Sequence, residues 1–172
     1  MSESFEFTDA DLVTVGTVGA PGRRVFLLQA IAGDTVATLK VEKQQVAALS
    51  VALLERLQDL AVTPFVPSDL ELRPPLEVAW IVGAMGLGYL DTLDRIVIDA
   101  VEAVVTDDDD NIDVEEAARA RILLTREQAQ ALAIRAADLV DAGRPPCPWC
   151  HHPLDPGGHT CPKTNGKHAP ER

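Results

Sequence analysis

The amino-acid sequence predicts an α+β body followed by a short metal-binding tail. Apolar runs typical of strands and periodic patterns typical of helices alternate along residues 1–142, in two successive β-β-β-α series. We expect antiparallel sheet pairing within each series, because short turn-forming segments separate its strands. The cysteines and histidines, by contrast, are confined to the end of the chain. We therefore divide the chain into a body, residues 1–142, and a tail, residues 143–172.

The first series consists of three strand-like segments and one helical segment. Residues 12–19 and 35–41 alternate between the two faces of a strand, whereas residues 24–32 form an almost continuous apolar run. This run predicts a strand that is buried on both faces. Residues 43–61 carry apolar side chains at spacings of three and four, which predicts a helix with one apolar stripe. Together they predict an antiparallel meander and a covering helix.

The second series repeats this order after a proline-rich connector. Strands are predicted at residues 76–86, 93–105 and 118–124, and a helix at residues 125–142. The helix begins with Thr125 and has Gln128 three residues later, which matches a capping box. Gly143, before Arg144 and two prolines, is a typical helix stop.

The two predicted helices resemble each other when they are aligned with a shift of 83 residues. The shift superimposes six pairs of similar residues, namely Lys43/Arg126, Gln45/Gln128, Ala48/Ala131, Leu49/Leu132, Val51/Ile134 and Glu55/Asp138. An internal duplication explains this similarity. Its strands would either join in one sheet or form two halves about a pseudo-twofold axis. The alternative is that two unrelated amphipathic helices share a similar composition.

The charge distribution restricts the classes of partner. The formal net charge is −12, and the body holds eleven Lys and Arg against 25 Asp and Glu. Such a body is unsuited to nucleic acid or anionic lipid, because phosphates require basic side chains. The longest uncharged apolar stretch, residues 78–90, is too short to span a bilayer, and the acidic first residues do not resemble a signal peptide. We expect a cytoplasmic protein without a membrane partner.

The tail carries the most specific chemical pattern. Cys147 and Cys150 are separated by two residues, and His159 and Cys161 follow after a segment rich in proline and glycine. Two thiolates at this spacing converge from one turn, and a second pair completes the four ligands of a tetrahedral zinc ion. We rank His159 first as the fourth ligand, with His152 and then His168 as alternatives. A closed site of this kind predicts structural Zn²⁺ that stabilises a segment with almost no apolar core.

Three stretches of the chain resemble an uncharacterised actinobacterial family with a C-terminal CPxC…HxCP signature. The stretches are residues 16–26, residues 78–89 and the cysteine-containing residues 144–166. The resemblance implies a domain of unknown function and the ligand set Cys147, Cys150, His159 and Cys161. Members of that family tend to be encoded near a lipid-kinase-like protein, which implies a kinase-like protein as a partner. The family would have a small residue, often glycine, after the two-cysteine turn, where this chain has His151-His152.

Other candidate sites have simpler explanations. The acidic run 107–110 lacks the glycine and glutamate of an EF-hand, so we expect a solvated loop. Residues 83–88 contain three glycines but are not followed by a helix, so close packing explains them better than a phosphate-binding loop. A small-molecule pocket at this segment is the alternative. Asp94, Asp99 and Glu102 are acids near or within a strand, and an outward-facing position explains Asp99 without catalysis.

Three functions agree with these patterns. The first is a non-enzymatic protein-binding or adaptor protein with a structural zinc. The second is an enzyme that uses zinc or carboxylates in a cleft between body and tail, although the body has no histidine or cysteine for a catalytic pair. The third is weak nucleic-acid binding by the tail through Trp149, Lys163 and Lys167. We favour the first, because a four-ligand cysteine-rich zinc is structural.

Overall fold

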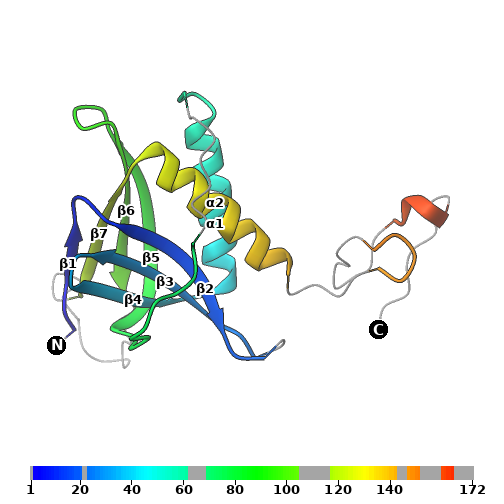
Figure 1. Cartoon of the computed structure of the whole chain (residues 1–172), viewed down its shortest axis with the longest axis horizontal. Helices are drawn as coiled ribbons and strands as arrows, with labels where there is room; N and C mark the ends of the chain where they lie inside the picture. Colours follow the sequence, from blue (N-terminus) through cyan, green and yellow to red (C-terminus); the bar gives the residue numbers. More distant parts are fainter. Residues whose placement is uncertain are drawn as a thin grey trace, which may run out of the picture.

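The computed structural model in Figure 1 describes residues 2–20, 23–61, 69–104, 117–142, 147–151 and 160–164. Within this part of the chain, none of the helices combines the length and the apolar character that crossing a membrane requires. In chain order the elements are β1 (Phe5–Phe7), β2 (Leu12–Val18), β3 (Val25–Ala32), β4 (Thr35–Val41), α1 (Lys43–Leu57), β5 (Trp80–Leu90), β6 (Arg95–Glu102), β7 (Arg119–Leu124), α2 (Arg126–Asp141) and the short 3-10 helix η2 (Pro162–Thr164).

The seven strands form one sheet whose two ends meet. Its strand order is β1-β7-β6-β5-β4-β3-β2, so β1 and β2 lie at opposite ends. Only residues 8–11 connect these two strands, and Asp11 N donates to Ile31 O at 2.8 Å. The sheet must therefore roll round until its first and last strands are neighbours. Figure 1 shows α1 and α2 together on one side of the strands.

Two antiparallel meanders make up this sheet, as the sequence predicts. The first meander is β2–β4 and the second is β5–β7. Parallel pairings join them, however, between β4 and β5 and between β7 and β1, so the sheet is mixed and not wholly antiparallel. These pairings are non-local and leave no local sequence pattern. The three-residue β1 was not predicted, because it is too short to show alternation.

The internal repeat is visible where the two helices cross. Ser50 Oγ donates to Ala133 O at 2.8 Å, and these residues are separated by the same 83 positions that align the helices. A residue that meets its own counterpart lies at a two-fold axis. Matching positions are buried on both helices, namely Val46/Ala129, Leu49/Leu132, Ser50/Ala133 and Leu53/Ala136. The structure thus supports two halves related by a pseudo-twofold axis.

The helix starts also correspond. At α2, Gln128 N donates to Thr125 Oγ1 at 3.1 Å and Thr125 N donates to Gln128 Oε1 at 2.9 Å, which confirms the predicted capping box. At α1, Glu42 N donates to Gln45 Oε1 at 2.8 Å. Each helix then packs on the opposite half, α1 against β5 and α2 against β2. The halves therefore share one core.

Several predicted boundaries differ from the structure. The first helix ends at Leu57 and not at residue 61, and the strand predicted at 76–86 is β5, which begins at Trp80. The residues just before it form a connector, with Ala79 N donating to Thr38 O at 2.9 Å. The predicted acidic loop 107–110 and the helix stop at Gly143 lie outside the described residues.

This connector covers the outer face of the first meander, which points away from the shared core. The amide of Gln29 holds the backbone of Arg73 on both sides, since Arg73 N donates to Gln29 Oε1 and Gln29 Nε2 donates to Arg73 O, each at 2.8 Å. Leu72 fills the space where a Cβ on Gly16 would stand. Gln29 is fully buried as a result.

The equivalent face of the second meander is exposed at Gly86, Asp99 and Arg121, whereas Val97 and Leu123 on the same face are buried. The repeat aligns Leu39 with Ile122, and strand register then aligns Leu28 with Ile98, which places Gly88 on the position of Gly16. Among the described residues, no atom lies within 4 Å of the position of a Cβ on Gly88. The two halves therefore share a fold but differ in what covers them.

We predict opposite tolerance at these two glycines. Gly16→Ala should lower the free energy of unfolding by about 1–2 kcal/mol, because its methyl group collides with Leu72 in a packed interior. Gly88→Ala should change the free energy by less than about 0.5 kcal/mol, because its methyl group enters open space. Urea unfolding of both variants measures this difference. Equal effects at both positions would contradict the proposed difference in what covers the two faces.

Candidate metal centre

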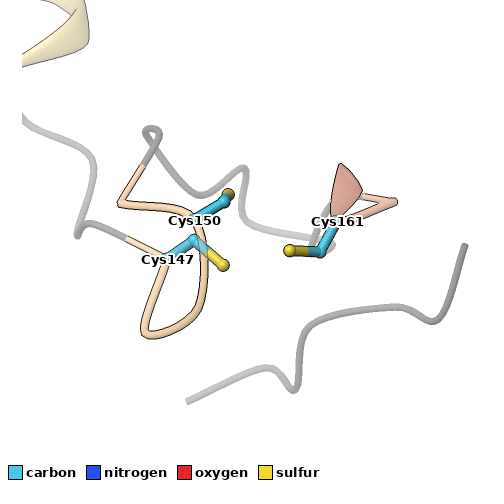
Figure 2. A group of neighbouring side chains, drawn as sticks. All are labelled: Cys147, Cys150 and Cys161. Carbon is cyan, nitrogen blue, oxygen red and sulfur yellow. The ribbon is translucent and has the colours of Figure 1, made fainter. Parts of the chain in front are cut away.

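Three cysteine side chains converge in the tail. Cys147 and Cys150 lie at either end of one turn, and Cys161 directly precedes η2. Figure 2 shows the sulfurs of the first two on the side of the turn that faces Cys161, whose own sulfur points back toward them. The three sulfur atoms all lie within 4.8 Å of one another. Residues far apart in the sequence thus form one compact thiol cluster.

The dimensions of this cluster fit a tetrahedral metal ion. With a Zn–S bond of 2.3 Å, two sulfurs of one tetrahedral zinc are separated by about 3.8 Å, which is compatible with the observed spacing. Cys147 and Cys161 are fully buried and Cys150 is half-buried. The hydrophobic cluster of the described tail consists of these cysteines. In the described tail, a thiol cluster that can hold a metal ion therefore stands where a larger domain would have a hydrophobic core.

The backbone of the turn explains an unexpected feature of the sequence. His151 N donates to Cys147 O at 2.9 Å, and this hydrogen bond closes the turn that carries the two thiols. At the end of this turn His151 adopts a positive φ of 62°. Glycine adopts this conformation without strain, whereas a residue with a Cβ does so at a cost. This accounts for the small residue that the family resemblance leads us to expect at this position.

The structure brings together only part of the predicted ligand set. Cys147, Cys150 and Cys161 meet as predicted, whereas His159 and its alternatives His152 and His168 lie outside the described residues. His159 therefore stays a prediction as the fourth ligand. The side chain of His151 is exposed, and its backbone N–H closes the turn that carries Cys147 and Cys150.

The acids singled out in the second meander have structural partners. Asp99 faces outward and lies 3.8 Å from Arg121 across the β6–β7 pair. Glu102 accepts hydrogen bonds from Ser2 Oγ at 2.5 Å and from Ala118 N at 3.2 Å. Both carboxylates therefore take part in interactions between strands, as expected for residues on the surface of a sheet.

Asp94 belongs to a small polar clamp at the β5–β6 turn. Its Oδ1 accepts from Tyr89 Oη at 2.6 Å and from Arg126 Nε at 2.8 Å. Arg126 also donates to Ala61 O at 2.9 Å, which ties the turn and the start of α2 to the segment that follows α1. These hydrogen bonds, first from Tyr89 and then from Arg126, lower the pKa of Asp94, and the bond to Asp94 raises the pKa of Tyr89.

The lowered pKa of Asp94 predicts a pH-dependent contribution to stability. Ionised Asp94 stabilises the fold at pH values above its ordinary pKa, and this contribution disappears as the pH falls through the lowered pKa of the folded state. Asp94→Asn should therefore melt below the wild type at pH 7, and the two melting temperatures should converge in acid. Asp91→Asn, on the same turn, provides the control. A difference that persists unchanged to pH 2 would exclude this explanation.

Two hollows mark the surface of the body. One, of about 440 Å³, lies between α1 and β5 and is lined by Ala48, Ala52 and residues 83–87, so the glycine-rich segment does border a pocket. The other, of about 430 Å³, lies beside the start of α1 and gathers Arg24, Lys40 and Lys43 around Glu42. The first hollow is largely apolar and the second is basic.

The strained turn predicts how two substitutions of His151 affect zinc affinity. His151→Gly should bind Zn²⁺ several-fold more tightly, because it removes a backbone cost of about 1 kcal/mol. His151→Ala keeps the Cβ and should leave the affinity close to that of the wild type. Competition with a chromogenic chelator measures all three proteins. A large loss of affinity in both variants would instead make His151 a ligand.

Comparison with known proteins identifies a family for the whole arrangement. A family model described as "Protein of unknown function (DUF3090)" matches residues 5–161. No curated protein and no solved structure matches the chain. The match begins at β1 and ends at Cys161, so it includes both meanders, the connector between them and all three cysteines. The chain therefore belongs to the DUF3090 family of proteins of unknown function.

Proposed function

We propose that this protein is a non-enzymatic protein-binding or adaptor protein whose tail is held by a structural zinc ion. The observation that carries the proposal is the cluster of three thiols within 4.8 Å, two of them fully buried. Thiolate ligands favour zinc among the common divalent metals, and a cysteine-rich site without an open position is structural. Cys147, Cys150 and Cys161 would supply three ligands and His159 the fourth.

Metal binding has a clear physical purpose in this tail. The described tail residues offer little apolar surface besides the cysteines themselves. So short a segment gains little free energy from burial, and metal binding then supplies most of its folding free energy. The zinc would thus keep the tail in one shape and allow it to present side chains to a partner.

Several features favour binding over catalysis. The three acids considered as catalytic candidates each have partners that explain them as structural residues. The body contains no histidine or cysteine from which to build a nucleophilic pair. Trp149, by contrast, is 39% exposed on the metal-binding turn, and exposed tryptophans are frequent anchors of protein interfaces. A cytoplasmic protein partner, for which the kinase-like protein is our candidate, fits these features.

Elemental analysis and cobalt substitution test the proposal. We expect one zinc per chain in protein purified without chelator, and loss of most of it in Cys161→Ala and His159→Ala, because each removes one of four ligands. The cobalt-substituted wild type should show the intense absorption of a tetrahedral thiolate site. This spectrum should not change when azide is added, because no coordination position is exchangeable.

Two controls separate the zinc site from general folding. Trp149→Ala alters the same turn without removing a ligand, so it should retain a full equivalent of zinc. Zinc that is unchanged in His159→Ala would exclude His159 as the fourth ligand. A cobalt spectrum that shifts with azide would indicate an open position and would favour the enzyme over the adaptor.

A further inference from the structure

The molecule shows how an extended segment lies on the outer face of one of its meanders. On the first meander, residues 70–73 run across the strands, with the backbone of Arg73 held by Gln29 and Leu70 O accepting from Thr14 Oγ1. Leu72 enters the space left by Gly16. This segment therefore shows which ligand chemistry such a face accepts, namely a peptide backbone and one leucine-sized side chain.

The second meander carries charged side chains at the aligned positions. Strand register aligns Gln29 with Asp99 and Thr38 with Arg121. Gln29 and Thr38 are buried under the connector, whereas the side chains of Asp99 and Arg121 are 54% and 49% exposed. Gly88, aligned with Gly16, has open space above it.

Asp99 and Arg121 together can make the hydrogen bonds that Gln29 makes in the first half. A glutamine amide provides one acceptor oxygen and a donor nitrogen, and Gln29 uses both on the backbone of one residue, Arg73. An ionised aspartate provides acceptors and an arginine provides donors. Asp99 and Arg121, which lie opposite each other on β6 and β7, can therefore bind the N–H and the C=O of an extended chain.

A hollow lies at the edge of this face of the second meander, at a position where the first half has a large side chain. In the first half, Arg135 from α2 donates to Val15 O at 3.4 Å and to Glu71 Oε1 at 2.9 Å. The 83-residue shift places Ala52 of α1 at the position of Arg135. Ala52 lines the 440 Å³ hollow beside β5. The small side chain thus leaves room at the edge of the open face.

We infer that this open face, formed by Gly86, Gly88, Asp99 and Arg121, is a docking surface for an extended peptide segment of a partner protein. The peptide places a leucine-sized side chain over Gly88 and its backbone between Asp99 and Arg121. Glycines in a strand allow such close approach of another backbone. The inference rests on the proposed protein-binding function and assigns it a surface on the body, apart from the zinc tail.

Charge selects among peptides of this kind. Arg119 lies on the same exposed face as Arg121, two residues away on β7. Two arginines, Arg119 and Arg121, and two carboxylates, Asp99 and the exposed Glu6 beside Arg121 on β1, share this face, so it suits a peptide that carries both signs of charge. The chain's own connector has this chemistry, since Glu71 and Arg73 flank Leu72.

A synthetic peptide with the sequence of residues 69–76 is therefore a suitable probe. The attached connector holds the first face at a high effective concentration, so the free peptide should occupy the second. We expect saturable binding below about 1 mM to the full-length ¹⁵N-labelled protein. Its amide shifts should centre on Gly86, Gly88 and Asp99, with little change at Gly16 and Gln29. A peptide in which alanine replaces the leucine at position 72 should bind about tenfold more weakly.

Matched variants locate the surface. Gly88→Leu fills the space that the peptide leucine would take and should weaken binding about tenfold or more. Arg121→Glu should weaken binding, whereas Arg23→Glu, the same charge change at an exposed residue outside this face, should not. Circular dichroism of each variant confirms that it is folded.

Four results would overturn the inference. They are the absence of saturable binding, shifts centred on Gly16, binding that survives both Gly88→Leu and Arg121→Glu, and self-association that these substitutions abolish, which would assign the face to a second copy. The zinc measurements are made separately. A wild type with one structural zinc and no peptide binding would therefore reject this surface and leave the proposed zinc-held tail intact.

Discussion

The exchange of helices between the two halves is the constraint on which the body depends. Each three-stranded meander has one helix after it, but that helix packs on the other half, α1 on β5 and α2 on β2. The helices then meet at Ser50 and Ala133, on the pseudo-twofold axis. Because neither half can bury its inner face alone, we expect the body to unfold as one cooperative unit. The parallel pairings of β4 with β5 and of β7 with β1 follow from the same arrangement.

The tail is stabilised by a different kind of interaction. The body has a continuous core of aliphatic side chains, whereas the described tail buries two cysteines around a common centre. A bound metal would replace burial as the source of folding free energy there. Body and tail can then respond differently to one condition, since a chelator would act on the tail and urea mainly on the body. The family match, which includes both, indicates that they nevertheless form one inherited unit.

Local patterns in the sequence predict much of the fold, and non-local contacts explain what they miss. Thr125 and Gln128 identify the start of α2, and the 83-residue shift identifies the repeat, because residue types alone show both, without knowledge of which segments pack together. The parallel contact of Leu39 with Trp80 joins strands across a long connector and has no local signal. The cysteine spacing predicts three ligands of the metal centre. The positive φ at His151 could not be predicted from the sequence, because glycine is the residue that usually indicates such a conformation and histidine is not.

Divergence between the two halves is more informative about function than their similarity. A duplication first produces two identical faces, so a later difference reflects either loss of a constraint or a new one. On the first face Gln29 and Thr38 are buried under the connector, and their neutral side chains suit a site without solvent. On the second face the aligned Asp99 and Arg121 are charged and about half exposed, as expected for side chains in contact with water. Gly88 nevertheless leaves a space on the second face that corresponds to the space above Gly16, which Leu72 fills on the first face. This glycine would let the backbone of a bound peptide approach the strand closely, which is the role that we propose for this face.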